Sequence, residues 1–338
     1  MLAQAALAGS TLSVEATLLD PLLVWGLFQR GLGLVHVVSF LSLSMQVLPY
    51  AGERGALPVR RVLERIARDF PGPRRFLYFP TLLWLDPSDR MLRGLTLLGA
   101  LSGAALVVGG PLAPAALLTC YLCQLSLDLA LALIFPWDCL LFECTLLGLF
   151  LPATRALPEL GAAALPAPAI AWAYRLLLFR VMFGFGKQKF VGARKRDSAY
   201  LRGFLVNQPL PSKLAWYAQK LPLPLLSAAV WFMFVVEVPA PFLALWPGVP
   251  SLVCAALTAL LMIGIQALGT FGYFSLISLV LCLPLLDGTT PLAFSLAAAF
   301  TDPALAAATA FVALHTLGAL AALPFNSWLG QSWHSWTY

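Results

Sequence analysis

The sequence is poor in charged residues. Only 11% of its 338 residues are charged, whereas 60% are hydrophobic, and the mean hydropathy is +0.86. Soluble domains carry about a quarter charged residues, so this composition excludes an ordinary soluble domain. Apolar runs of about 20 residues, long enough to cross a bilayer core of roughly 30 Å, recur along the chain. We therefore expect an integral membrane protein.

Motifs that carry common enzymatic chemistry are also absent. The sequence has no phosphate-binding loop and no GxSxG nucleophile motif. The three histidines, His36, His315 and His334, are too scattered to predict a metal site. All six cysteines lie in apolar segments, where free cysteine behaves as a small buried hydrophobe, so no disulfide framework is predicted.

Hydropathy predicts an all-α fold, a polytopic helical membrane protein with about eight or nine transmembrane helices and one amphipathic surface helix over 59–70. Residues 1–17 lack the basic region of a cleavable signal peptide, so the first apolar run is expected to be retained. We expect one transmembrane domain over 1–338 with a short tail over 324–338. The predicted spans are 22–48, 91–109, 113–135, 137–151, 167–186, 223–246, 250–269, 271–287 and 304–323.

Basic residues are concentrated in two predicted loops, 50–93 and 187–222. Together these loops hold 17 of the 21 lysines and arginines. Four predicted spans separate them, so both loops fall on one side of the membrane, as the positive-inside rule expects. In a bacterial-type membrane this side is the cytoplasm. The net charge of +6 is thus a signal for membrane orientation and requires no nucleic-acid partner.

Seven charged residues are predicted to lie within the bilayer, where a charge is costly and usually pairs in the bundle interior or forms a ligand or proton site. Asp138 is expected in the first turn of its helix, where the helix dipole favours a carboxylate. Glu143 is within reach of Arg175 or Arg180, and Arg30 is expected to pair structurally or to bind a ligand. The seven are Arg30, Asp128, Asp138, Glu143, Arg175, Arg180 and Glu237.

The segment from Arg175 to Pro222 is the most distinctive part of the chain. It starts as an apolar helix and is predicted to pass, after Gly184 and Gly186, into a polar loop of roughly thirty residues. The two glycines permit close helix approach or unwinding. Lys187 and Lys189 follow at the membrane surface, either as anchors at the lipid headgroups or as a partly desolvated base.

Several segments, taken in order, resemble the lipase maturation factor family over about residues 22 to 287. The later stretch Phe271–Phe274 is similar to an Asn-Tyr-Gly-Phe-Phe-Asn stretch of that family, without its asparagines. The other segments that carry the resemblance are Trp25–Leu32, Phe79–Trp84 with Ser88–Asp89, Trp137–Glu143, Leu178–Gly184 leading to Lys189, and Gln208–Pro211 with Ala215–Tyr217.

The resemblance implies a multi-pass membrane protein that helps exported lipases to fold and assemble, in animals within the endoplasmic reticulum membrane. It implies that the matching positions shape the membrane domain, without catalytic residues or a cofactor. Animal members continue into a large soluble C-terminal domain, and the Arg-rich, Lys-poor composition suggests a bacterial inner membrane. The best-matching positions are Trp137, Asp138, Glu143, Arg180, Gln208 and Pro209.

A second resemblance involves the short stretch Gly186–Phe190. It is similar to the Gly-x-Lys-Lys-Leu stretch of vitamin K-dependent γ-glutamyl carboxylases, where the second lysine acts as the base toward a reduced quinone. This similarity implies Lys189 as a catalytic base and a quinone or lipid as cofactor or substrate.

Three functions therefore remain open. The first is a non-enzymatic folding or maturation factor for an exported, lipase-like client protein in the lipid bilayer. The second is a membrane enzyme with Lys189 as base, which predicts a lipid-sized cavity walled by the spans that carry Arg30, Glu143 and Arg180. The third is a structural membrane subunit, which predicts a stable stoichiometric partner.

Overall fold

The computed structural model describes residues 19–131, 135–191, 198–208 and 210–289, together with residues 310 and 314. In this part of the chain the regular secondary structure is helical, accompanied by two isolated β-bridges. The predicted span over 304–323 lies almost entirely outside the described residues. The predicted tail over 324–338 and Pro209 also lie outside them.

Six helices are long and apolar enough to cross a membrane, and they confirm the predicted polytopic helical class. The surface helices are α2 (Val59–Asp69), α3 (Arg74–Tyr78), α8 (Ser198–Asn207) and α9 (Lys213–Ala218). Two apolar helices are shorter, α6 (Pro136–Gly148) and α12 (Phe274–Cys282) with its 3-10 extension Leu283–Leu286. The six long ones are α1 (Pro21–Ala51), α4 (Asp89–Val108), α5 (Ala113–Leu131), α7 (Pro168–Val191), α10 (Leu223–Glu237) with its 3-10 continuation η3 (Ala240–Leu245), and α11 (Val249–Leu268).

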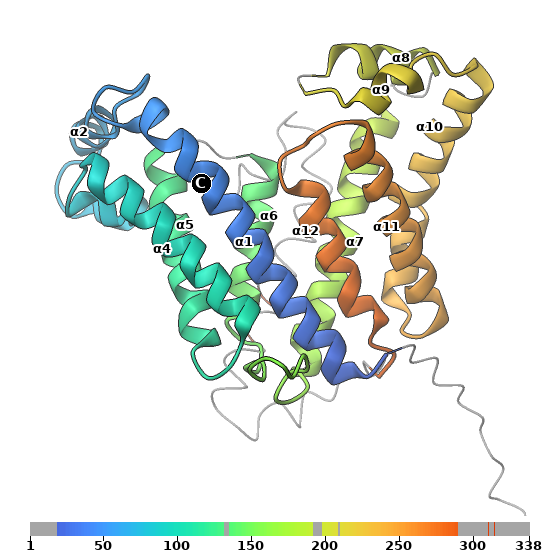
Figure 1. Cartoon of the computed structure of the whole chain (residues 1–338), viewed down its shortest axis with the longest axis horizontal. Helices are drawn as coiled ribbons and strands as arrows, with labels where there is room; N and C mark the ends of the chain where they lie inside the picture. Colours follow the sequence, from blue (N-terminus) through green and yellow to red (C-terminus); the bar gives the residue numbers. More distant parts are fainter. Residues whose placement is uncertain are drawn as a thin grey trace, which may run out of the picture.

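The helices form two side-by-side groups that meet along α1, α6 and α12 (Figure 1). One group contains α1, α4, α5 and α6, and the other contains α7, α10, α11 and α12. Helix α1 packs most extensively on α4, where Gly33 and Gly103 face each other. A Cβ built on Gly33 would lie 2.8 Å from the carbonyl oxygen of Gly103. Small residues at this crossing therefore allow the two backbones to touch, as in other membrane helix pairs.

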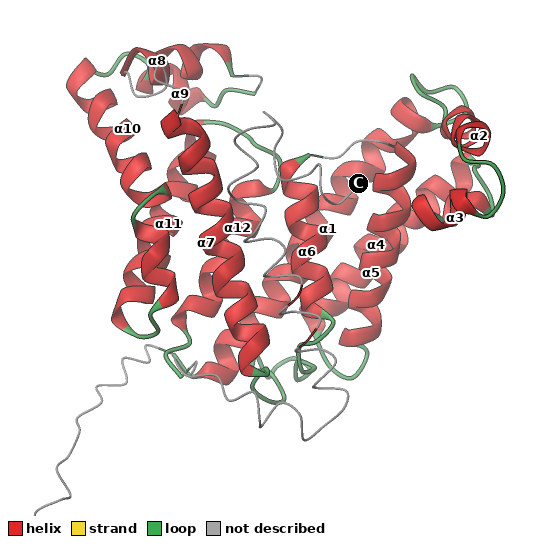
Figure 2. Cartoon of the chain, turned by 180° about the vertical axis from the view of Figure 1, so that it is seen from behind, coloured by secondary structure: helices red, strands yellow, loops and turns green. Residues whose placement is uncertain are grey.

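The two basic segments lie at the same end of the helices, as the distribution of arginine and lysine predicted. Helices α2 and α3 cap one helix group at this end and α8 and α9 cap the other, as seen from both sides in Figures 1 and 2. The connection between α6 and α7 lies at the opposite end. The amphipathic surface helix predicted over 59–70 is confirmed as α2.

The prediction of a polar loop over 187–222 is wrong. Helix α7 continues through Gly184 and Gly186 to Val191, and α8 and α9 follow it. Both surface helices have an apolar face, and Leu205 and Ala215 pack against Leu226 of α10 in a small buried cluster. The polar residues of α8 and α9 indicate a loop in the sequence. The two segments form helices because their apolar faces are buried against the rest of the protein.

We predict that cysteines replacing Arg61 in α2 and Lys213 in α9 are labelled by a membrane-impermeant maleimide from the same side of the membrane. Both residues are exposed at the basic end. Glu159→Cys, in the exposed α6–α7 connection, is the control and should be labelled only from the other side. Labelling of the Arg61 and Lys213 positions from opposite sides would contradict the arrangement.

Candidate functional site

Arg30 acts as a clamp on the backbone between α6 and α7. It is buried in α1, and its guanidinium donates to the carbonyl oxygens of Val107 at 2.6 Å, Arg155 at 2.8 Å and Glu159 at 2.6 Å. Gln29 adds a bond of 2.7 Å from its Nε2 to the carbonyl oxygen of Pro152. Carbonyl oxygens satisfy the charge in this region of low dielectric, so the geometry gives Arg30 a structural contact.

Arg175 connects α7 to the segments that follow α10 and α12. Its guanidinium is fully buried and donates to the carbonyl oxygens of Ala244 at 3.1 Å and Asp287 at 2.6 Å. The Asp287 carboxylate accepts from Trp25 Nε1 at 2.9 Å. These contacts join α1, α7, η3 and the end of the 3-10 turn after α12. Asp287 was not singled out in the sequence, because it stands at the edge of an apolar run.

The Glu143 carboxylate forms an ion pair with Arg180 between α6 and α7. Of the two partners that the sequence allowed for Glu143, the structure selects Arg180. Both side chains are almost entirely buried, with exposed fractions of 12% for Glu143 and 4% for Arg180. A buried pair with good geometry satisfies both charges, but removal of one partner leaves the other charge stranded.

Asp138 lies in the first turn of α6, as predicted, and ties that turn to a neighbouring helix. One carboxylate oxygen accepts from the backbone N–H of Phe135 at 2.9 Å, and the other accepts from the Tyr273 hydroxyl just before α12. The adjacent Trp137 ring stacks on the Phe135 ring with the centroids 4.9 Å apart. A Cβ on Gly272, whose φ is +57°, would lie 3.3 Å from the Trp137 indole, so glycine fits this turn best.

Lys189 pairs with Glu237 at the basic end of the molecule. Its Nζ donates to Glu237 Oε1 at 2.5 Å, which connects the last turn of α7 to the end of α10. Gly186 makes the approach possible, because a Cβ there would lie 2.7 Å from the carbonyl oxygen of Glu237. Of the two roles foreseen for the pair of glycines, close approach is confirmed at Gly186 and unwinding is wrong.

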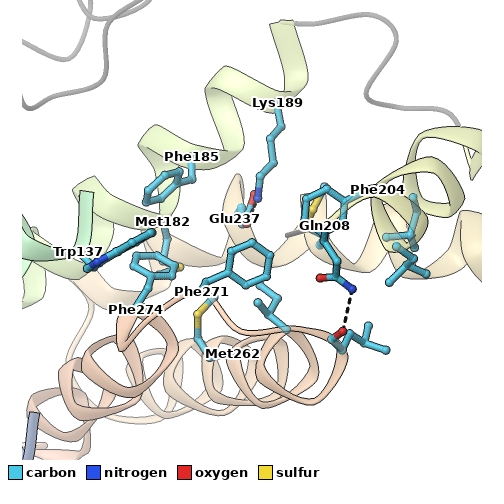
Figure 3. Close-up of a pocket in the computed structure, with 15 residues that line it drawn as sticks. Trp137, Met182, Phe185, Lys189, Phe204, Gln208, Glu237, Met262, Phe271 and Phe274 are labelled. Atoms are coloured by element: carbon cyan, nitrogen blue, oxygen red, sulfur yellow. Dashed lines mark hydrogen bonds and ion pairs between the residues drawn. The ribbon is translucent and has the colours of Figure 1, made fainter. Parts of the chain in front are cut away.

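A cavity of about 290 Å³ opens between α7, α8, α10 and α11 next to this ion pair (Figure 3). Gln208 contributes an amide whose Nε2 donates to the carbonyl oxygen of Leu268 at 2.9 Å. The rest of the lining is apolar apart from Lys189 and Glu237. The residues that line it are Trp137, Met182, Phe185, Lys189, Leu201, Phe204, Leu205, Gln208, Met233, Glu237, Met262, Ile265, Leu268, Phe271 and Phe274.

Three of the candidate residues predicted from the sequence, Trp137, Lys189 and Gln208, line the cavity. The other described candidates, Arg30, Asp138, Glu143, Arg180 and Lys187, do not line it. This cavity is not walled by the span of Arg30, and the Arg30 guanidinium donates instead to the backbone of the α6–α7 connection. The spans of Glu143 and Arg180 contribute other side chains, Trp137 and Met182.

Sequence reasoning missed Glu237 as the partner of Lys189 and missed the aromatic wall of the cavity. Glu237 was recognised as an acid in an apolar span, but 48 residues separate it from Lys189. Glu237 lies nearer the end of its predicted span, 223–246, that faces away from the basic segment of Lys189, so predicted side gave no signal for this pair. Phe204 and Phe271 gave none, since aromatic residues are frequent throughout the chain.

These features define a polytopic helical membrane protein whose helices are joined by buried polar contacts and enclose an apolar cavity at the basic end. A model of the family described as the lipase maturation factor transmembrane domain matches residues 23–292. The chain therefore belongs to the lipase maturation factor family, as the resemblance implied.

Named relatives agree with this assignment. The chain is 33% identical to lipase maturation factor 2 of Rattus norvegicus over 77% of its own length and 40% of the relative. The Homo sapiens protein of the same name is 33% identical over 77% and 39%. Lipase maturation factor 1 of Bos taurus is 31% identical over 57% and 36%. No solved structure matches the chain significantly.

The chain spans about two fifths of the length of these lipase maturation factor 2 relatives. All three relatives are vertebrate proteins, so the bacterial membrane suggested by the composition stays a prediction.

We predict that replacing either Glu143 or Arg180 by leucine alone strongly destabilises the protein. The loss should be about 3–5 kcal/mol, because each single change strands a buried charge. The Glu143→Leu, Arg180→Leu double variant should recover most of this loss, since it strands neither charge. Thermal unfolding of the four proteins in one detergent measures the effect. Losses that simply add in the double variant would contradict a direct pair.

Proposed function

We propose that this chain forms the membrane domain of a non-enzymatic maturation factor that assists the folding or assembly of an exported, lipase-like hydrolase. The observation that carries the proposal is the family match over residues 23–292. The similar vertebrate proteins bear the name lipase maturation factor. A folding factor needs a rigid membrane platform that presents a surface to its client.

The buried charges are consistent with a platform. Arg30 and Arg175 donate to carbonyl oxygens of neighbouring segments, and Arg180 pairs with Glu143. Each contact joins elements that are distant in sequence, so these charges stabilise the arrangement of the helices. These contacts support the proposal that positions selected by the family resemblance, such as Glu143 and Arg180, shape the domain.

The α6–α7 connection is the surface that we expect an exported client to contact. The positive-inside rule puts the basic helices on the cytoplasmic side, which leaves this connection on the side of an exported protein. It is held in place by Arg30 and by a backbone bridge between Thr154 and Ala162. Leu160 and Leu165 expose 43% and 49% of their surface on it. Exposed apolar side chains on a rigid backbone suit protein contact.

We predict that an exported hydrolase co-purifies with the tagged protein from its own membranes and is identified by mass spectrometry. The Lys189→Met, Glu237→Gln double variant removes the ion pair without stranding a charge and should retain the same client. A wild-type sample with a stoichiometric membrane partner but no exported protein would favour a structural subunit. If neither sample contains a client, and the wild type converts a quinone or lipid substrate that the double variant does not convert, the enzyme alternative would be favoured.

Leu160→Ser with Leu165→Ser should reduce the amount of co-purified client several-fold, because these changes remove exposed apolar contacts and leave the buried core intact. Leu77→Ser is the matched control. Leu77 is 76% exposed on α3 at the basic end, where no contact with an exported client is expected. Quantitative mass spectrometry against the tagged protein measures the ratio. Equal client loss in both variants would argue against the α6–α7 surface.

A further inference from the structure

The cavity beside Lys189 contains polar groups whose hydrogen-bonding capacity is incompletely used. Glu237 is 2% exposed and Gln208 is 6% exposed, so both side chains are well buried. Glu237 Oε1 accepts from Lys189, but Glu237 Oε2 has no hydrogen-bond partner among the described residues. Gln208 Nε2 donates to Leu268, whereas Gln208 Oε1 also lacks a partner in that part of the chain.

Two unpaired acceptors in one buried cavity are unusual. A buried acceptor left without a partner costs about 1–3 kcal/mol, so most such groups in folded proteins are satisfied. Ten other buried side-chain atoms of the described residues also lack a partner, among them Nε of Arg30 and Nε of Arg175. The cavity differs because both of its unpaired atoms are acceptors on residues that line one open space, which can admit a hydrogen-bond donor from outside the chain.

The rest of the cavity specifies the body of that ligand. In Figure 3 Lys189 points toward Glu237 near the centre of the view, and Gln208 lies to the right beside Phe204. Aromatic and methionine side chains, including those of Trp137 and Phe274, fill the left of the view without polar groups among them apart from the indole nitrogen. A polar head and an apolar body would therefore each meet a matching surface. A volume of about 290 Å³ is at the lower end for ligand pockets, which suits a single chain.

Charge narrows the class of ligand further. The Lys189 ammonium and the Glu237 carboxylate already neutralise each other, so the site has no unpaired charge to attract an ion. A fatty-acid carboxylate would place further acceptors beside the two unpaired oxygens and add no donor. A hydroxyl group donates one hydrogen bond and carries no charge, which fits both requirements.

From these observations we propose that the cavity binds a neutral, single-chain lipid with a hydroxyl head, of the monoacylglycerol type. Its hydroxyls donate to Glu237 Oε2 and Gln208 Oε1, and its acyl chain lies among the aromatic and methionine side chains. The site goes beyond the proposed maturation function and does not depend on it.

The test uses the full chain in lipid nanodiscs and a photoactivatable monoacylglycerol that carries a diazirine in its acyl chain. Peptide mapping should locate the label in segments that line the cavity. Unlabelled monocaprin should compete with the probe, whereas capric acid, which has the same acyl chain and a carboxylate head, should compete at least about tenfold less well. This comparison needs no variant. Equal competition by the two compounds, or label confined to other segments, would overturn the proposal.

A matched pair of variants on α11 tests the location. Ile265 lines the cavity, whereas Ile263, on the same helix, is 55% exposed. Ile265→Trp should fill the space and abolish specific labelling, while Ile263→Trp should leave it unchanged. Thermal unfolding and size-exclusion profiles of both variants establish that they fold. Labelling of the folded Ile265→Trp protein at the wild-type level would overturn the proposal.

Two protein variants test the hydrogen bonds proposed for the lipid head group. Glu237→Gln and Gln208→Met each remove one proposed acceptor and should weaken competition by monocaprin by about twofold to tenfold, as expected for one hydrogen bond. Competition by capric acid should not weaken in parallel, because it donates no hydrogen bond to these groups. Unchanged monocaprin competition in both variants would contradict the assigned head-group contacts.

Discussion

Burying a charge inside a membrane domain is costly, and this constraint organises the whole structure. Arg30, Arg175 and Arg180 each meet carbonyl or carboxylate oxygens from another part of the chain. The long guanidinium side chains reach across helix boundaries, so satisfying each charge also joins elements. Because a lost partner would strand a charge, the buried polar contacts determine which parts of the chain must meet.

Helix α7 occupies the centre of this arrangement. Along its length Arg175 reaches the ends of α10 and α12, Arg180 reaches α6, and Lys189 reaches α10. The first two contacts are enclosed in protein, whereas the third borders an apolar cavity. In each case a basic side chain of α7 contacts oxygen atoms of other elements. The Arg175 and Arg180 contacts connect helices, whereas the Lys189–Glu237 pair borders the cavity and leaves Glu237 Oε2 without a partner among the described residues.

The two ends of the molecule differ in chemistry in a way that matters for function. The basic end carries the surface helices and the cavity, while the opposite end presents the α6–α7 connection held by Arg30. The proposed maturation factor would contact an exported client on one side and be oriented by basic residues on the other. The division between the two ends is consistent with that proposal, and it separates the proposed lipid cavity from the proposed client surface.

The sequence alone determined the membrane class, the positions of most described spans, the common side of the basic segments and the family. These properties follow from local hydropathy, charge and residue order, which depend little on distant contacts. It also placed Asp138 in a first helical turn and offered Arg180 as a partner for Glu143. Only the tertiary structure decided that residues 187–222 contain helices and that Lys189 pairs with Glu237. It also decided that Arg30 donates to the backbone of the α6–α7 connection and does not line the cavity. These depend on which apolar faces and charges meet in space, and residues as far apart as 129 positions decide them.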